Sequence, residues 1–212
     1  MQAQLRSQTR KEEIINAATH GAGLLLALIA IPFLIIKAGE KGNAKVIISV
    51  SSFAFGVVAV YLCSTIYHLI SHPGIKRKAN IADHISIFFL IGGTYTPVVF
   101  IYTSLTLGLV FLIVQWSIIA VGATLKLFFT GKYNKLSLIL YITLGWMLVF
   151  IIQPVLQNMP ANIFYLIVGG GIFYSAGTIF FRLDKKLYAH NIWHCFVLAG
   201  TLCHFIAIYK SL

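Results

Sequence analysis

Residues 189–209 read A-H-N-I-W-H-C-F-V-L-A-G-T-L-C-H-F-I-A-I-Y, an apolar stretch long enough to cross a bilayer as one helix. It contains no acidic residue, lysine or arginine, yet it carries His190 and His194 four residues apart. Side chains at i and i+4 lie on one helix face about one turn apart, which allows two imidazoles to share a metal ion. Ionisable side chains at membrane depth are costly and usually functional. The stretch therefore predicts a transmembrane helix with a candidate metal-binding face.

The composition of the whole chain indicates an integral membrane protein. Of its 212 residues, 59% are hydrophobic and 10% are charged, and the mean hydropathy is +0.90. This leaves too little polar surface to enclose a water-soluble core of this size. The three cysteines fall in apolar runs without a C-x-x-C pair, so neither a disulfide framework nor a zinc ribbon is indicated. The first apolar run is too long for the core of a signal peptide, and we expect it to be retained as a span.

Seven apolar segments of sufficient length are separated by charged or turn-forming breaks. These spans are expected near residues 17–37, 46–71, 82–101, 105–126, 135–155, 162–182 and 189–209. Residues 1–16 then form a short cytoplasmic N-terminal segment, and residues 17–212 form one transmembrane domain. The sequence thus predicts an all-α membrane bundle of seven helices.

The basic residues predict the orientation of this bundle, because short cytoplasmic loops accumulate lysine and arginine. With the N-terminus inside, the cytoplasmic segments hold twelve of the 16 basic residues: Arg6, Arg10, Lys11, Lys76, Arg77, Lys78, Lys126, Lys132, Lys135, Arg182, Lys185 and Lys186. The outer side receives the other four: Lys37, Lys41, Lys45 and Lys210. We expect a multi-pass protein of the plasma membrane, of the bacterial inner-membrane kind, with a cytoplasmic N-terminus and an outer C-terminus. The net charge of +11 suits anionic lipid headgroups, whereas nucleic-acid binding favours a continuous basic stripe that is absent here.

Polar residues from three spans are expected at one depth on the cytoplasmic side. His68 lies roughly 7 Å from the end of its helix at 1.5 Å per residue, and His190 and His194 lie roughly 6 to 12 Å from the same edge. Asp83, in the first turns of the third span, is at a similar level, although it could instead cap the helix or complement its dipole. Ser64 precedes His68 by one turn on the same helix face.

Three neutral imidazoles with an open fourth position are typical of a catalytic zinc site. Bound zinc lowers the pKa of a coordinated water to about 7 and so supplies hydroxide at neutral pH. Asp83 is then a candidate general base, and Ser64 a candidate for orienting the carboxylate or a substrate oxygen. Other first-row metal ions also accept three imidazoles.

The remaining histidines fit such a site less well. His204 lies roughly 15 Å beyond His194 along the helix, so we expect it to hydrogen-bond within the bundle. His72 abuts a proline at a helix end and is expected to be wet, and His84 points about 100° away from Asp83, toward the headgroups. His20 also begins a span on the cytoplasmic side. It could be a ligand, a partner that orients a ligand, or a packing contact.

At these residues the chain resembles the hemolysin III family, within the progestin and adipoQ receptor superfamily that includes the adiponectin receptors. The resemblance rests on E-E-I-I-N-A-A-T-H-G at residues 12–21, S-T-I-Y-H at 64–68, the Asp of I-A-D-H-I-S-I at 81–87, and H-N-I-W-H at 190–194. It implies seven helices, a cytoplasmic N-terminus and an intramembrane zinc. Carried over residue by residue, it implies that the metal ligands are His68, His190 and His194, that Asp83 contacts the zinc-bound water, and that Ser64 lies beside them.

The same resemblance implies hydrolysis of lipid amides, since adiponectin receptors are associated with ceramidase activity. The leading hypothesis is therefore a zinc-dependent membrane hydrolase whose partners are membrane lipids and a lipid-amide substrate; whether it is an enzyme is left open. One alternative is a lipid-state sensor, or regulator of membrane homeostasis, with a structural zinc. Another is a channel, transporter or pore-forming hemolysin, although the polar groups gather on one side of the membrane. No protein partner is predicted.

Overall fold

The computed structural model describes residues 8–130 and 133–212, and within these ranges it consists of helices and connections, without strands. Arg6 and Lys132, used above to predict orientation, lie outside the described residues, as does the whole of 1–7. Seven segments of the described chain are long and apolar enough to cross a membrane: α1 (Arg10–Glu40), α2 (Ala44–Leu69), α3 (Pro73–Tyr102), α4 (Leu105–Phe129), the segment Lys135–Asn158, α7 (Ala161–Arg182) and α8 (Ala189–Ser211). The predicted all-α fold with seven spans is confirmed.

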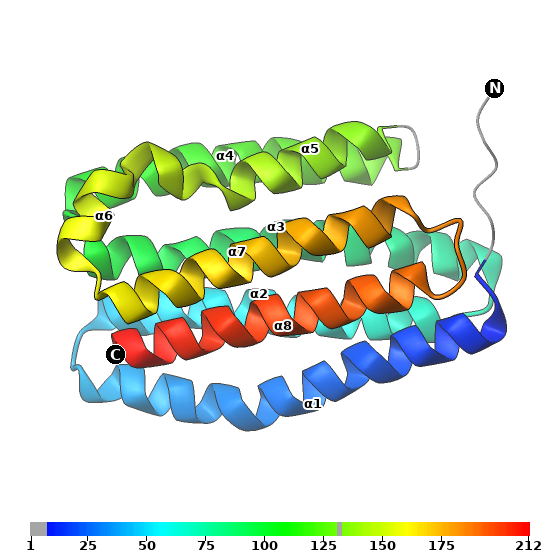
Figure 1. Cartoon of the computed structure of the whole chain (residues 1–212), viewed down its shortest axis with the longest axis horizontal. Coiled ribbons are helices and arrows are strands. Elements are labelled where there is room, and N and C mark those ends of the chain that lie inside the picture. The colour runs from blue at the N-terminus through cyan, green and yellow to red at the C-terminus, as the bar shows by residue number, and fades with distance from the viewer. Residues whose placement is uncertain (1–7, 131–132) are drawn as a thin grey trace.

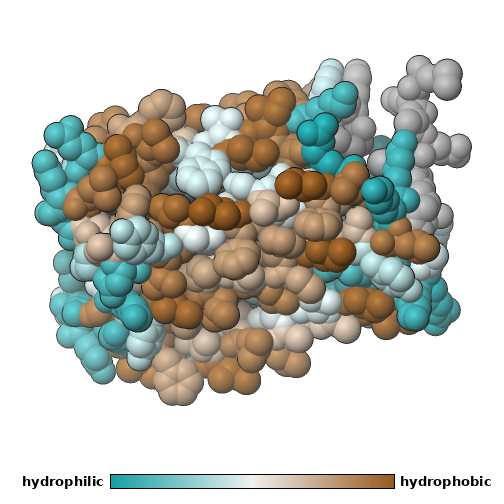
Figure 2. Space-filling model, viewed as in Figure 1, coloured by the Kyte–Doolittle hydropathy of each residue, from teal (hydrophilic) through white to brown (hydrophobic). Residues whose placement is uncertain are grey.

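The spans lie side by side in one bundle (Figure 1). The most extensive pairings join α2 with α3, α7 with α8, and α1 with α2. α1 begins and α8 ends at opposite ends of the bundle, as an odd number of crossings requires (Figure 1). Hydrophobic residues cover most of the middle of the face shown in Figure 2, and hydrophilic residues gather toward its two ends. This pattern suits a protein whose waist lies in hydrocarbon. Which end faces the cytoplasm stays a prediction.

α1 extends well upstream of its apolar stretch because a capping box begins it. The Thr9 amide donates to Glu12 Oε2 at 2.8 Å, and the Glu12 amide donates to Thr9 Oγ1 at 3.3 Å. Such reciprocal bonds satisfy amides that have no partner within the first turn of a helix. Residues 10–16, expected to precede the first span, are therefore its first two turns.

The close pairing of α2 and α3 depends on glycines at their contact. A Cβ placed on Gly93 would lie 2.5 Å from the carbonyl oxygen of Ser52, and one placed on Gly56 would lie 2.6 Å from that of Phe89. Backbone therefore meets backbone at this crossing, as small residues allow in membrane helix pairs. The crossing sets α2, which carries Ser64 and His68, against α3.

The fifth span is interrupted near its middle rather than forming the single helix expected over 135–155. α5 (Asn134–Gly145) is followed by the 3-10 segment η1 (Met147–Ile151) and by α6 (Ile152–Asn158). The Tyr95 hydroxyl donates to the Gly145 carbonyl at 2.7 Å and accepts from the Leu148 amide at 3.1 Å. An unsatisfied backbone group costs several kcal/mol in hydrocarbon, on the order of 2–7 kcal/mol. A side chain of α3 thus satisfies the polar groups at this break.

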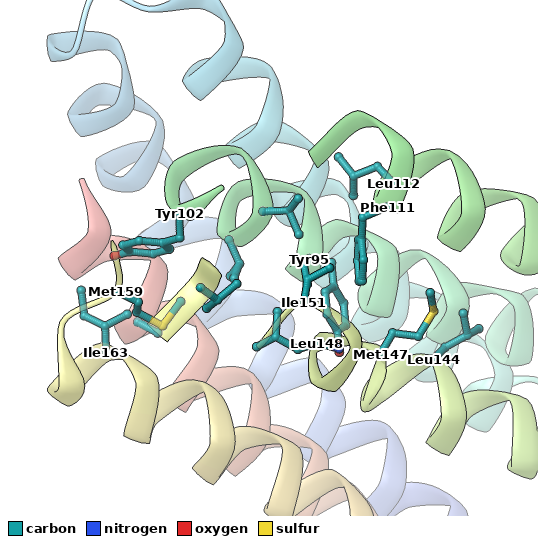
Figure 3. Packing of buried hydrophobic residues seen from close by; sticks show 14 of the residues in the cluster. Tyr95, Tyr102, Phe111, Leu112, Leu144, Met147, Leu148, Ile151, Met159 and Ile163 are labelled. Carbon is teal, nitrogen blue, oxygen red and sulfur yellow. The ribbon is translucent and has the colours of Figure 1, made fainter. Parts of the chain in front are cut away.

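Figure 3 shows the apolar cluster that surrounds this break. Side chains from α3, α4, the fifth span and α7 pack together here, with Tyr102 and Met159 near one limit of the cluster and Leu144 near the other. Phe111 lies against Tyr95, with ring centroids 5.5 Å apart. The buried members of this apolar cluster are Phe88, Tyr95, Val98, Val99, Tyr102, Phe111, Leu112, Ile119, Leu144, Met147, Leu148, Ile151, Val155, Met159, Ile163 and Ala207. The cluster lies toward the end of the bundle where α3 ends.

Candidate metal centre

Three histidines from two helices meet at the end of the bundle where α2 ends and α8 begins. One candidate ligand nitrogen from each of His68, His190 and His194 lies within 4.8 Å of the other two. The ring centroids of His190 and His194 are 4.9 Å apart, and those of His68 and His194 are 5.0 Å apart. His68 and His194 are buried and His190 is half-buried. The structure therefore brings the three predicted ligands close enough to hold one metal ion.

The ring of His68 is held on its outer side by a carboxylate of α1. His68 Nδ1 lies 2.6 Å from Glu13 Oε2. A carboxylate can only accept, so the imidazole donates from Nδ1. The second oxygen, Glu13 Oε1, lies 3.0 Å from Nζ of Lys76 on α3. One glutamate therefore links α1 to both α2 and α3 at the site.

The other two imidazoles also have neighbours away from the cluster. The ring of His194 hydrogen-bonds the backbone of Asn16 on α1. His190 Nδ1 lies 3.3 Å from an oxygen of Asp184, without the geometry of a hydrogen bond. Metal-binding histidines typically use the ring nitrogen that faces away from the metal to contact a carboxylate or a backbone carbonyl. The surroundings of these rings have that character.

Asp83 lies near the histidine cluster but outside the group of mutually close ligand atoms. Its carboxylate interacts electrostatically with His190, and the Ser64 side chain lies within hydrogen-bonding reach of it. Ser64 and Asp83 therefore lie next to each other beside the cluster. Because three histidines and no carboxylate make up the close group, Asp83 can contact a small molecule at the cluster without closing it as a fourth ligand.

The clustered histidines suit a metal ion because two of their ring nitrogens are buried without a hydrogen-bond partner among the described residues. Within the described part of the chain, neither His68 Nε2 nor His194 Nδ1 has a hydrogen-bond partner, and both atoms are buried. Leaving such atoms without a partner costs on the order of 1–3 kcal/mol each. A cation coordinated by neutral imidazole nitrogens satisfies them, and three histidines suit zinc and neighbouring first-row ions.

The other histidines take different places. His20 stacks on His194, with centroids 3.6 Å apart and ring planes inclined by 10°, and it is outside the close group of ligand atoms. His204 lies near the Ile167 carbonyl at 3.0 Å, as expected for a bond within the bundle. His72 is exposed. His84 is half-buried, and its Nδ1 lies 2.8 Å from the Asn80 carbonyl, so it is not simply directed at headgroups.

Sequence reasoning gave His20 a possible role at the site but none to Glu12 and Glu13. Both residues precede the expected first span, yet Glu12 Oε1 accepts a hydrogen bond from the backbone amide of Tyr188 at 2.9 Å. Tyr188 adopts a left-handed backbone, with φ of 62°, directly before α8. Such backbone persists only where its surroundings hold it. The side-chain amide of Asn191 donates to the Glu12 backbone carbonyl at 3.0 Å, so the start of α1 fixes the start of α8.

A signal for these residues was present in the sequence. The polar residues of 12–20 recur at helical spacing, which places Glu13, Asn16 and His20 on one face. That face contacts two of the three clustered histidines: Glu13 bonds His68, and both Asn16 and His20 contact His194. Asn16 also accepts a hydrogen bond from the Asn191 side chain. A polar stripe at the start of an apolar helix is thus informative even where single residues are not.

Comparison with known proteins finds relatives that match most of the chain. A family model described as "Haemolysin-III related" matches residues 8–205. Hemolysin-3 of Bacillus cereus is 38% identical over 202 residues, which is 95% of this chain and 92% of that protein. A hemolysin-3 homolog of Bacillus subtilis (strain 168) is 40% identical over 200 residues, 94% of each. The human monocyte to macrophage differentiation factor is 27% identical over 175 residues, covering 76% of this chain and 68% of that protein.

Proposed function

Because the chain belongs to the haemolysin-III-related family, as a multi-pass bacterial membrane protein, we propose that it is a zinc-dependent hydrolase of lipid amides. The observation that carries the proposal is the group of three histidines with buried, unpaired ring nitrogens and a carboxylate nearby. We also place the centre near the cytoplasmic face, because the basic residues gather at the loops of this end.

In this proposal His68, His190 and His194 hold the metal, and Asp83 and Ser64 serve the reacting water. The metal, when bound, supplies a water of lowered pKa and polarises a carbonyl oxygen. Asp83 accepts a proton as water attacks the carbonyl carbon of the amide, and then returns it to the departing nitrogen. Ser64 keeps the carboxylate turned toward the histidines. The products are a fatty acid and an amine.

The test is fatty-acid release from a panel of acyl-amide lipids that includes ceramides, with purified protein and added zinc. We expect turnover by the wild type, none by His194→Ala, and a fall of roughly 100-fold or more in Asp83→Asn, since general bases contribute about 10² to 10⁴. His72→Ala is the matched control, because His72 is exposed at the same end of the bundle. Absence of turnover across the panel by zinc-loaded wild type would contradict the proposal.

A structural metal in a lipid-state sensor is the second candidate, and the position of the ligands favours it. The three histidines come from α2 and α8, whereas α8 packs chiefly on α7 and α1. A metal would therefore join two helices that share little direct packing. Binding that is confined to the folded protein stabilises it, by about 4 kcal/mol at a thousand times the dissociation constant.

Chelation separates the two candidates. For a sensor, removing the metal lowers the midpoint of thermal unfolding, and the zinc-loaded protein releases no fatty acid. For the hydrolase, removal abolishes turnover, and turnover returns when zinc is added back. Asp83→Asn sharpens the distinction, because it leaves all three histidines in place and only the hydrolase depends on its carboxylate.

A further inference from the structure

The contacts of Glu13 extend the site beyond the three histidines. Its two carboxylate oxygens contact different helices: Oε2 accepts from His68 at 2.6 Å and Oε1 lies 3.0 Å from Lys76 Nζ. The side chain is 18% exposed, and that of His68 is fully buried. Hydrogen bonds to an ionised acceptor are shorter and stronger than those between neutral groups, and this one is short. The carboxylate thus determines which face His68 presents to the cluster.

Lys76 is in turn held in one place. Its ammonium has three donors, and three acceptors surround it: Glu13 Oε1 at 3.0 Å, the Tyr67 carbonyl at 3.0 Å and the Ile70 carbonyl at 3.2 Å. The last two belong to the C-terminal end of α2, where carbonyls lack partners within the helix. The ammonium also lies 4.5 Å from the centre of the Tyr67 ring. Lys76 therefore ties the end of α2, the start of α3 and the Glu13 carboxylate together.

We propose that Glu13 is the positioning residue of the metal centre and that Lys76 acts through it. Glu13 keeps the proton of His68 on Nδ1, so that the unpaired, buried Nε2 is the atom presented to a metal. Lys76 keeps the carboxylate from turning away. The inference rests on the metal centre of the proposed function, but it concerns the orientation of a ligand rather than the reaction.

The first test measures metal binding in the full-length protein, with Co²⁺ as the probe and a competing chelator. We expect Glu13→Gln to lower the affinity by about 10- to 100-fold, as is typical when the partner of a metal-binding histidine is lost. The visible absorption bands of bound Co²⁺ should shift, because they report ligand geometry, which a loss of fold stability alone would not alter. Lys76→Met should change affinity in the same direction by less.

Matched controls and a double variant separate positioning from charge. Glu40→Gln and Lys78→Met remove the same charges from exposed positions, and both should leave affinity and spectrum unchanged. If Lys76 acts through Glu13, the double variant Glu13→Gln with Lys76→Met binds Co²⁺ no more weakly than Glu13→Gln alone. Wild-type affinity and spectrum in Glu13→Gln would overturn the proposal, and additive losses would overturn the role of Lys76.

A second measurement needs no metal. Nitrogen NMR of ¹⁵N-histidine-labelled, metal-free protein at pH 8 reports which ring nitrogen carries the proton, with His68→Gln identifying the His68 signals. We expect the Nδ1–H form in the wild type and a mixture of forms in Glu13→Gln; an unchanged Nδ1–H form in the variant would refute the proposal. Should the wild type bind no Co²⁺, the proposed function would fail, whereas this measurement would still decide the role of Glu13. If Glu13→Gln does not fold, Glu13→Asp replaces it in both measurements, because it keeps the charge but shortens the side chain that reaches His68.

Discussion

The two ends of the bundle are built by different means. At the end that holds the histidines, α1, α2, α3 and α8 are joined by hydrogen bonds among buried and half-buried polar side chains, such as those of Glu13 with His68 and of Asn16 with Asn191. At the other end, the apolar cluster packs α3 against α4, the fifth span and α7. Its main polar contact is the Tyr95 hydroxyl, which serves the break in the fifth span.

Stability and ligand binding therefore depend on different parts of the bundle. Within a membrane, helix association depends on close packing and on satisfied polar groups, since lipid tails are as apolar as the helices. The apolar cluster stabilises by packing, and the residues that make it up include no histidine. The histidine end leaves buried nitrogens unpaired, which stabilises nothing until a ligand binds. Substitutions at the two ends should therefore separate metal binding from folding.

The largest effect is expected from removing a ligand. His68→Ala should lower metal affinity by about 100-fold or more, beyond the 10- to 100-fold typical of losing only a ligand's partner. Elemental analysis of purified protein measures the bound metal, and circular dichroism reports whether the helices remain. Equal metal content in the wild type and His68→Ala would show that the histidine end holds no metal through this residue.

A substitution at the α2–α3 crossing should change metal affinity less than the loss of a ligand does, and it should clearly lower the free energy of unfolding. Gly93→Ala places a Cβ against the Ser52 carbonyl and should lower the unfolding free energy by about 1 to 3 kcal/mol, as overpacking does. Unfolding in mixed detergent micelles provides the measurement. Gly169→Ala is the matched control, because a Cβ there meets no atom within 4 Å. If the two variants are equally stable, α2 and α3 can move apart at the crossing without loss of stability, and the prediction is wrong.

Tyr95→Phe tests the apolar cluster at its polar contact. The change removes one oxygen and leaves the Gly145 carbonyl and the Leu148 amide without that partner, which should cost about 1 to 2 kcal/mol of unfolding free energy. Metal content should stay at the wild-type level. Tyr165→Phe, at an exposed position, should be neutral. Loss of metal in Tyr95→Phe would mean that the two ends are coupled.

The smallest effect is expected from the cap of α1. Thr9→Ala removes one half of the capping box and should cost about 1 kcal/mol of unfolding free energy, while Thr9→Ser should retain it. Because this cap orders the turn that carries Glu12 and Glu13, hydrogen exchange should rise at residues 10–16 before it rises elsewhere. Uniform exchange across α1 in Thr9→Ala would show that contacts with α8 alone hold this turn.

Much of the fold followed from patterns that hydrocarbon imposes on any sequence. Seven long apolar runs predicted the seven spans, and the spacing of His190 and His194 predicted a shared helix face. His68 joined them because helix direction and rise per residue convert sequence position into depth. The break in the fifth span was not predicted, because residues 147–151 are as apolar as the rest of the span. What holds the break is the hydroxyl of Tyr95 on another helix, α3.

By itself the sequence determined that this chain spans a membrane and at what depth its polar residues lie, because burying a helix in lipid constrains length, composition and charge position. Only the tertiary structure decided which polar residues meet. Glu13, Lys76 and His68 are distant in sequence, and their contact depends on how α1, α2 and α3 are rotated about their axes. That rotation is settled by packing between helices, such as the glycine crossing of α2 and α3, and no pattern within one helix specifies it.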